Sequence, residues 1–246
     1  MISFFKRSTS KSNASKSIAL TADMHAHFLP GIDDGASDMA ESLMLIQKLS
    51  ESGYKKLVAT PHIMNDFFRN TPEIIMDKLA EVKLAVAEKG WDIELEAAAE
   101  YYLDEFFLEK LQQGEPLLTF GNRYLLFETS FINQPAQLNE AIFLMQSLHY
   151  KPVLAHPERY MYLQDNFDRC VELFQNGVLL QININSLTGY YAMPAQLLAE
   201  RLIDLKMVHF AGTDCHAIKH IKAMQIAKSK KYYARLLEAD LLNHKI

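Results

Sequence analysis

The sequence predicts an α/β fold, and more narrowly a distorted (β/α)7, TIM-like barrel. Seven short apolar runs rich in β-forming residues alternate with longer segments of helical periodicity, as in βαβ units around a parallel sheet. Polar residues of metal-binding types end these runs, at steps close to the roughly 30 residues of one βαβ unit. Seven units, one fewer than in a complete TIM barrel, indicate that the barrel is incomplete or distorted.

Each element is predicted from its own pattern. The strands are short apolar runs, predicted over 18–24, 56–60, 93–99, 124–129, 152–155, 179–184 and 208–213. The helices are amphipathic, and are predicted over 38–50, 72–88, 136–148, 167–176, 194–205 and 218–243. The helix 72–88 has the clearest ends, because Thr71 is an N-cap residue, Pro72 stands at the first helical position and Gly90 follows the last turn. No linker interrupts residues 20–246, so we expect a single domain there.

Composition narrows the functional classes. The chain has 246 residues, 49% of them hydrophobic and 22% charged, which is typical of a compact domain that folds without disulfides. A net charge of −5 argues against a nucleic-acid-binding protein with a broad basic face. Cys170 and Cys215 are too few for a disulfide framework, which favours a reducing, cytoplasmic location. No apolar run is long enough to predict a membrane span.

Residues 1–19 differ from the rest of the chain. They contain Lys6, Arg7, Lys11 and Lys16 among serines, without the apolar stretch that a signal peptide requires. We expect a flexible basic tail. Weak electrostatic contact with an anionic membrane surface is the alternative interpretation.

The residues at the strand ends carry the functional prediction. The carboxyl ends of parallel barrel strands meet at one rim, where active sites lie. Five histidines and four carboxylates are expected there: His25, His27, Asp34, His62, Glu100, Glu128, His156, Asp214 and His216. So many acids and imidazoles would lie unpaired without cations among them, and they exceed what one ion binds. We therefore predict two or three divalent ions. Nitrogen and oxygen donors without thiolates suit Mn, Fe or Zn.

Several neighbours of these residues have two interpretations. Asp33 lies in a glycine-bounded turn, where its side chain is expected to bond to the backbone. Arg159 offers a fork of donors that suits phosphate oxygens, and a salt bridge to Glu158 or to another rim carboxylate is the alternative. Arg69 is a second candidate for phosphate. Cys215 alternates with its neighbours and is expected to point away from them into the core. Most aromatic residues that follow the strand ends are expected to pack, and a few to wall a pocket for an aryl substrate.

Motifs in the same order resemble those of the PHP metallophosphoesterase superfamily. They are Asp23 to His27, Pro30 to Gly35, Ala59 to His62, Ala99 to Tyr102, His156 to Tyr160, Asn183 to Gly189, and Gly212 to His216. Within the superfamily the chain is similar to the bacterial protein-tyrosine phosphatases, which act on tyrosine kinases controlling capsule and exopolysaccharide synthesis. Asp34 and Glu128 stand where histidinol phosphatases of the superfamily usually carry histidine.

The resemblance implies a metal-dependent phosphomonoester hydrolase of this PHP fold with up to three ions, Mn the most expected. It places His25, His27, Glu100 and Asp214 on one ion, and Glu128 and His156 on a second that Glu100 bridges. Asp34, His62 and His216 would hold a third. Arg159 and Asp34 are the catalytic candidates, with Arg159 clamping the phosphate. A small-molecule phosphatase of the histidinol-phosphatase type is the alternative, and a metal-binding regulatory protein without turnover is a further one.

Overall fold

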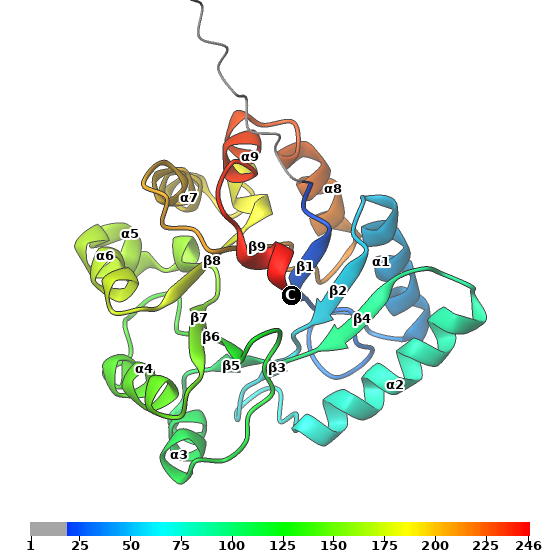
Figure 1. Ribbon diagram of the computed structural model, residues 1–246, viewed down its shortest axis with the longest axis horizontal. Coiled ribbons are helices and arrows are strands. Elements are labelled where there is room, and N and C mark those ends of the chain that lie inside the picture. Colours follow the sequence, from blue (N-terminus) through cyan, green and yellow to red (C-terminus); the bar gives the residue numbers. More distant parts are fainter. Residues whose placement is uncertain (1–18) are drawn as a thin grey trace, which may run out of the picture.

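The barrel is described by a computed structural model over residues 19–246. In Figure 1, helices surround a central ring of strands, and the chain travels around the ring once. The strand segments are β1 Ala22–Ala26, β2 Lys56–Ala59, β3 His62–Ile63, β4 Glu94–Ala97, β5 Glu100–Tyr102, β6 Tyr124–Glu128, β7 Lys151–Leu154, β8 Leu179–Asn183 and β9 Phe210–Gly212. Only two residues separate β2 from β3, and only two separate β4 from β5, so each pair forms one interrupted strand. The described chain therefore has seven barrel strands.

All the strand pairings are parallel. The order is β1-β2-β4 in one sheet and β3-β5-β6-β7-β8-β9 in the other, and the interrupted strands join the two. A parallel bridge between Ala26 and Cys215 connects the first strand to the chain just after the last. This arrangement confirms the predicted distorted (β/α)7 barrel.

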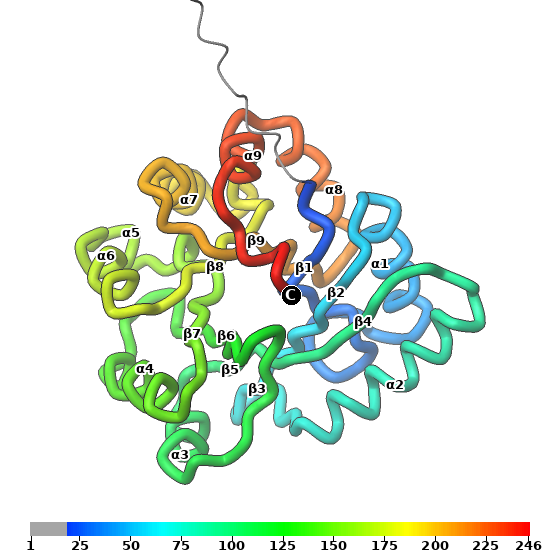
Figure 2. The backbone as a smooth tube through the Cα atoms, in the orientation of Figure 1, coloured from blue at the N-terminus to red at the C-terminus, as the bar shows by residue number. Residues whose placement is uncertain are grey.

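The C-terminal end closes the barrel from the side where the strands begin. Figure 2 shows the last segment entering the middle of the strand ring. The buried side chain of Asn243 donates to the carbonyls of Ala22 and Ala211 at 3.1 and 2.8 Å, and accepts from the amide of Ala211 at 3.0 Å. Leu242 and Ile246 pack against the apolar interior of the barrel. A single amide side chain thus ties the first strand to the last.

Helices cover the outside of the ring. They are α1 Met39–Glu51, α2 Pro72–Glu88, α3 Glu105–Gln113, α4 Leu138–Ser147, α5 Met161–Asp165, α6 Phe167–Gln175, α7 Met193–Asp204, α8 Ile218–Ala227 and α9 Lys231–Leu236. Short 3₁₀ segments are η1 Pro157–Arg159, η2 Ile184–Thr188 and η3 Leu242–Lys245. The prediction of α2 was correct at both ends. The prediction of one helix over 218–243 was wrong, because α8, α9 and η3 divide this stretch, and α3 was not predicted.

The first strand also starts and ends later than predicted, at Ala22 and Ala26, and His25 lies inside it because of the later end. The predicted basic tail, residues 1–19, falls outside the described residues except for its last position. Among the helices of the described chain, none has the length and apolar character needed to cross a bilayer.

Candidate metal centre

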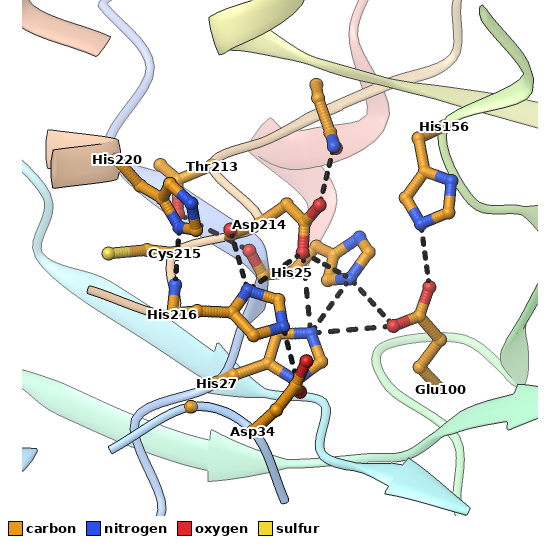
Figure 3. A network of polar contacts seen from close by, with 12 residues as sticks. His25, His27, Asp34, Glu100, His156, Thr213, Asp214, Cys215, His216 and His220 are labelled. Atoms are coloured by element: carbon orange, nitrogen blue, oxygen red, sulfur yellow. Dashed lines mark hydrogen bonds and ion pairs between the residues drawn. The ribbon is translucent and has the colours of Figure 1, made fainter. Parts of the chain in front are cut away.

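The barrel brings all nine predicted ligand residues to one rim. His25 lies in β1, His62 begins β3, Glu100 begins β5 and Glu128 ends β6, while the remaining five lie in the loops that follow strands. Figure 3 shows the side chains of most of them pointing toward one another: His25, His27, Asp34, Glu100, His156, Asp214 and His216. Three overlapping sets offer donor atoms within 4.8 Å of each other: His27, Asp34, His62 and His216; His25, His27 and Glu100; and His62, Glu100 and Glu128.

One group of four donors has the spacing of ligands around a single ion. Nε2 of His25 lies 3.2 Å from Nε2 of His27, and 3.1 Å from Oε2 of Glu100. Oδ1 of Asp214 lies 3.5 Å from both imidazole nitrogens. Four tetrahedral donors about 2.1 Å from an ion are separated from each other by about 3.4 Å. The separations among His25, His27 and Glu100, and those of Asp214 from the two imidazoles, are therefore close to the spacing of ligands around one ion.

Further donor atoms lie next to this group on two sides. Oε1 of Glu100 lies 3.1 Å from Nε2 of His156, while its Oε2 lies 3.3 Å from Nδ1 of His62. On the other side, Oδ1 of Asp34 lies 3.5 Å from Nε2 of His62 and 3.3 Å from Nε2 of His216. The two oxygens of Glu100 therefore face different donors, as a carboxylate that bridges two ions would.

His62 departs from the grouping that the family resemblance implies. Its Nδ1 lies 3.0 Å from Oε1 of Glu128, and its Nε2 faces Asp34. The imidazole therefore borders the second and the third expected ion positions. Despite its short distance to Glu128, this Nδ1 has no hydrogen-bond partner, and Nδ1 of His156 has none either. For His62, a buried nitrogen close to two carboxylates but not bonded to them is the arrangement expected where donors converge on a cation.

Local backbone features place the ligands. His156 and Asp214 both adopt left-handed backbone conformations, with φ of 33° and 49°. Such conformations cost free energy in residues other than glycine and concentrate at functional sites. Two glycines permit close packing behind the histidines: a Cβ on Gly35 would lie 2.0 Å from the carbonyl oxygen of His27, and one on Gly212 would lie 2.7 Å from Cβ of His25. Any side chain at either glycine would displace a ligand.

Hydrogen bonds to the ring nitrogens that face away from the centre orient the histidines, and the sequence predicted only some of the residues that make them. Asp33 makes the predicted turn bond, since its Oδ1 accepts from the amide of Gly35 at 2.9 Å. Its Oδ2 also lies 2.8 Å from Nδ1 of His27. Gln181, which no sequence pattern singled out, places Oε1 2.8 Å from Nδ1 of His25. These contacts fix which nitrogen of each imidazole faces the centre. An amide in the middle of an apolar strand run was the available signal for Gln181.

Charge is strongly coupled across the centre. Burial disfavours the protonated form of His27, but the neighbouring carboxylate of Asp33 outweighs this and holds its pKa well above the usual value. Burial is likewise outweighed at His62, where the charge of Glu100 helps to raise the pKa to about 9. The charges of His25 and His62 hold the pKa of the buried Glu100 well below its usual range. Protons on the imidazoles therefore balance the negative charges of the carboxylates, and a metal cation would replace these protons on binding.

Arg159 borders the centre on its open side. It ends η1, and one guanidinium nitrogen donates to Oδ2 of Asp214 at 2.9 Å. The guanidinium carbon lies 4.5 Å from the ring centroid of Phe131 and 4.3 Å from that of Tyr191, so that aromatic rings hold its plane. The predicted alternative, a bond to a rim carboxylate, is therefore present. It uses only part of the guanidinium and leaves donors for a ligand.

The centre opens into a hollow of about 390 Å3. Asp34, half-exposed, and Arg159 line it together with the aromatic side chains Phe68 and Phe131. The ring of Phe68 stacks on the imidazole of His62, with centroids 5.5 Å apart. Arg69, the second phosphate candidate of the sequence, does not line this hollow. We define these walls and the nine ligand residues as the metal-centre hollow.

Neither cysteine can act as a nucleophile here. Figure 3 shows the sulfur of Cys215 pointing away from the imidazoles, as predicted. Burial raises the pKa of this thiol and raises that of Cys170 to about 12, so both stay protonated. A parallel barrel with a rim of histidines and carboxylates, in which neither Cys170 nor Cys215 is available as a thiolate, is typical of the class of metal-dependent hydrolases.

The particular family follows from comparison with known proteins. Residues 21–244 match the family model for capsular polysaccharide synthesis, CpsB/CapC. The chain belongs to this family of metal-dependent tyrosine-protein phosphatases. It is 29% identical to the CapC protein of Staphylococcus aureus, over 91% of this chain and 89% of that one. It is 26% identical to the tyrosine-protein phosphatase YwqE of Bacillus subtilis, over 80% of this chain and 78% of the relative.

Solved structures agree with this assignment. A structure from a study of YwqE from Bacillus subtilis and CpsB from Streptococcus pneumoniae, described as unique metal-dependent tyrosine phosphatases, superposes with a TM-score of 0.77 at 25% identity. That match covers 89% of this chain and 95% of the other. The phosphotriesterase homology protein of Escherichia coli matches with a TM-score of 0.50 at 16% identity, over 88% of this chain and 90% of that one. This second likeness concerns the fold alone.

Proposed function

We propose that this chain removes phosphate from phosphotyrosine in a polypeptide, and that its partner is a bacterial tyrosine kinase of capsule or exopolysaccharide synthesis. The family and the names of its relatives support this proposal. The observation that carries it is the metal-centre hollow, in which aromatic side chains stand beside a dense set of metal ligands. In this proposal the phenyl ring of the substrate lies in the hollow lined by Phe68 and Phe131, and its phosphate reaches the ligand cluster.

The nine rim residues hold two or three divalent ions in this proposal. Donor spacing near 3.4 Å and the three overlapping ligand sets support this number. The donors are all nitrogen or oxygen atoms, which supports Mn first and leaves Fe or Zn as the other candidates. When bound, the ions supply electrophilic stabilisation of phosphate oxygens and lower the pKa of water.

Residues of the chain itself bind the phosphate and take up a proton. Arg159, fixed by Asp214 and two rings, donates to a phosphate oxygen where negative charge accumulates in the transition state. The hydrogen bond from His216 holds the pKa of Asp34 below its usual range, so this half-exposed carboxylate is ionised and stands where it can accept a proton from water. Burial, and the nearby charge of Arg159, lower the pKa of His156, which keeps this imidazole in its neutral, metal-binding form.

A comparison of the turnover of two substrates tests the proposal. A phosphotyrosine peptide and histidinol phosphate are compared with added manganese. We expect the peptide to be turned over with the higher kcat/KM, and a chelator to abolish turnover. Faster hydrolysis of histidinol phosphate would favour the small-molecule alternative, and absence of turnover with either would favour a regulatory role.

A pair of variants then locates the chemistry. His27→Ala is expected to abolish turnover, while Cys215→Ser retains it, because the Cys215 sulfur points away from the centre. The opposite pattern would exclude a metal-dependent mechanism.

We also propose that the N-terminal tail makes weak contact with a membrane surface. Removal of residues 1–17 is expected to change localisation near a membrane kinase and to leave turnover of a soluble substrate intact.

A further inference from the structure

A second hollow adjoins the metal-centre hollow across a single loop. The loop 64–68 folds back on itself, with the amide of Met64 donating to the carbonyl of Phe68 at 2.9 Å and the reverse bond at 2.8 Å. Phe68 faces the metal centre, while Asn65 faces the other side. Met64 lines both spaces. A chain that leaves the metal-centre hollow over Met64 therefore enters the second hollow directly.

The second hollow has an apolar floor and enough room for more than one side chain. Its volume is about 510 Å3, larger than that of the metal-centre hollow. Ile63, Tyr101, Pro72 and Leu117 belong to its lining. At its edge the ring of Phe106, the second residue of α3, is 50% exposed. Exposed apolar surface of this kind beside a catalytic centre is typical of a binding site.

One cation in the lining of this hollow has no carboxylate partner among residues 19–246. Lys110 is neutralised by an ion pair with Glu115. Glu73, the other carboxylate of the lining, is bonded by Thr71 in the first turn of α2. Arg69 is exposed, and only its Nε is engaged, by the carbonyl of Asn65 at 2.7 Å. Within residues 19–246 no carboxylate pairs with it, so its terminal nitrogens are available to an acidic group.

We propose that this second hollow, which we name the flanking subsite, binds the residues next to the phosphotyrosine of a polypeptide substrate. It takes an apolar side chain on its floor and an aspartate or glutamate at Arg69. The proposal rests on the proposed function, because it assumes a phosphotyrosine in the metal-centre hollow. A free aryl phosphate ends inside that hollow and does not reach Arg69 or Phe106. The flanking subsite therefore gives preference for polypeptides, and among them for those with acidic and apolar neighbours.

Charge reversal at Arg69 tests the subsite. Two phosphotyrosine peptides are used, identical except that one carries glutamates and the other lysines on both sides of the phosphotyrosine, together with p-nitrophenyl phosphate as a free aryl phosphate. The wild-type protein with manganese is expected to favour the glutamate peptide in kcat/KM by roughly three- to ten-fold, the range for a partly exposed charge contact. Arg69→Glu is expected to reverse this preference through KM, with kcat on p-nitrophenyl phosphate unchanged.

Two controls separate the subsite from general effects. Lys83→Glu makes the same charge change on α2, ten residues beyond Glu73 and thus about 15 Å along the helix, further than charges act at physiological salt. It is expected to change neither peptide preference nor turnover. Phe106→Ser is expected to raise KM several-fold for a peptide with apolar neighbours, whereas Phe143→Ser, which removes another exposed ring from α4, leaves it unchanged.

The outcomes distinguish the two proposals. An unchanged peptide preference in Arg69→Glu, or an equal loss with p-nitrophenyl phosphate, would overturn the flanking subsite while leaving the phosphatase activity in place. If the wild-type protein hydrolyses neither peptide, the proposed function itself fails. Circular dichroism of each variant verifies that the fold is retained.

Discussion

The role of Arg159 can be separated into two parts by replacing it with lysine. Lysine keeps the positive charge but loses the planar fork of donors. In the structure one nitrogen of Arg159 is occupied by Asp214 at 2.9 Å, and the guanidinium lies against the rings of Phe131 and Tyr191. A lysine ammonium group at this position cannot hold Asp214 and also reach a phosphate oxygen in a fixed direction. We therefore expect Arg159→Lys to lose nearly as much as Arg159→Ala.

The magnitude follows from the placement of the side chain. Arg159 is 23% exposed and is held by Asp214 and two aromatic rings, so its free donors are oriented before substrate binds. Removal of one such preorganised donor typically costs a factor of 10² to 10³, or about 3 to 4 kcal/mol of transition-state stabilisation. We expect Arg159→Lys to lower kcat/KM for an aryl phosphate by about 100-fold, with most of the loss in kcat.

Two measurements accompany the kinetics. Metal content is determined in parallel, because Asp214 is both the partner of Arg159 and a candidate ligand. Arg123→Lys is the matched control: Arg123 donates only to the carbonyls of Leu148 and His149, away from the rim. The reasoning is refuted if Arg159→Lys keeps more than a third of the wild-type kcat/KM. A loss of activity that follows a loss of metal would instead make Arg159 a support for Asp214.

Three further predictions concern positioning and stability. Asp33→Asn is expected to weaken metal binding by 10- to 100-fold in a titration, since Asp33 orients His27; unchanged affinity would contradict this. Asn243→Ala is expected to lower the free energy of unfolding by about 3 kcal/mol in urea, because it removes three buried hydrogen bonds to backbone groups at the barrel seam; a loss below about 1 kcal/mol would count against that role. Burial raises the pKa of Glu158 from 4.5 to about 7, so its stabilising contribution is complete below pH 4.5 and is lost as the pH rises to 7. Glu158→Gln is therefore expected to gain up to about 3 kcal/mol relative to wild type between pH 4.5 and pH 8, and an equal difference at both pH values would exclude the titration.

The strand ends could be predicted from the sequence because each one combines two local signals. A buried parallel strand is a continuous apolar run, and the polar residue that ends it marks the rim. The interruption after Ala97 was not visible, since Ala98 and Ala99 continue the apolar run. The interruption after Ala59 did have a signal, because Pro61 follows and has no amide hydrogen to donate to a neighbouring strand. His62 and Glu100 consequently lie in short strand segments of their own. Their side chains still face the centre, because the second segment of each strand continues the barrel wall.

The C-terminal region shows where local signals fail. A helical period continues from 218 to 243, and neither glycine nor proline marks the breaks. The chain nevertheless leaves the helix after Ala227, where Lys228 donates to the carbonyl of Ser52 at 2.6 Å. Tertiary contacts also decide the final turn, since Asn243 must reach the barrel seam. The missed helix α3 is different, because Asp104 and Gly114 did supply capping signals.

Which of the nine ligand residues share an ion could not be predicted from the residue types, and this grouping has a chemical consequence. Residue types identify the nine side chains, but their division among ions depends on distances between strands. In the structure His27, Glu100 and His62 each belong to two of the three donor sets. Sets that share members cannot be filled independently, because an ion in one set fixes the orientation of a ligand in the next. Loss of Glu100 should therefore disturb two ion positions, whereas loss of Asp34, which belongs to one set, should disturb one. The imidazoles and carboxylates of this rim act as one continuous site, and its apparent metal affinity is a property of the whole cluster.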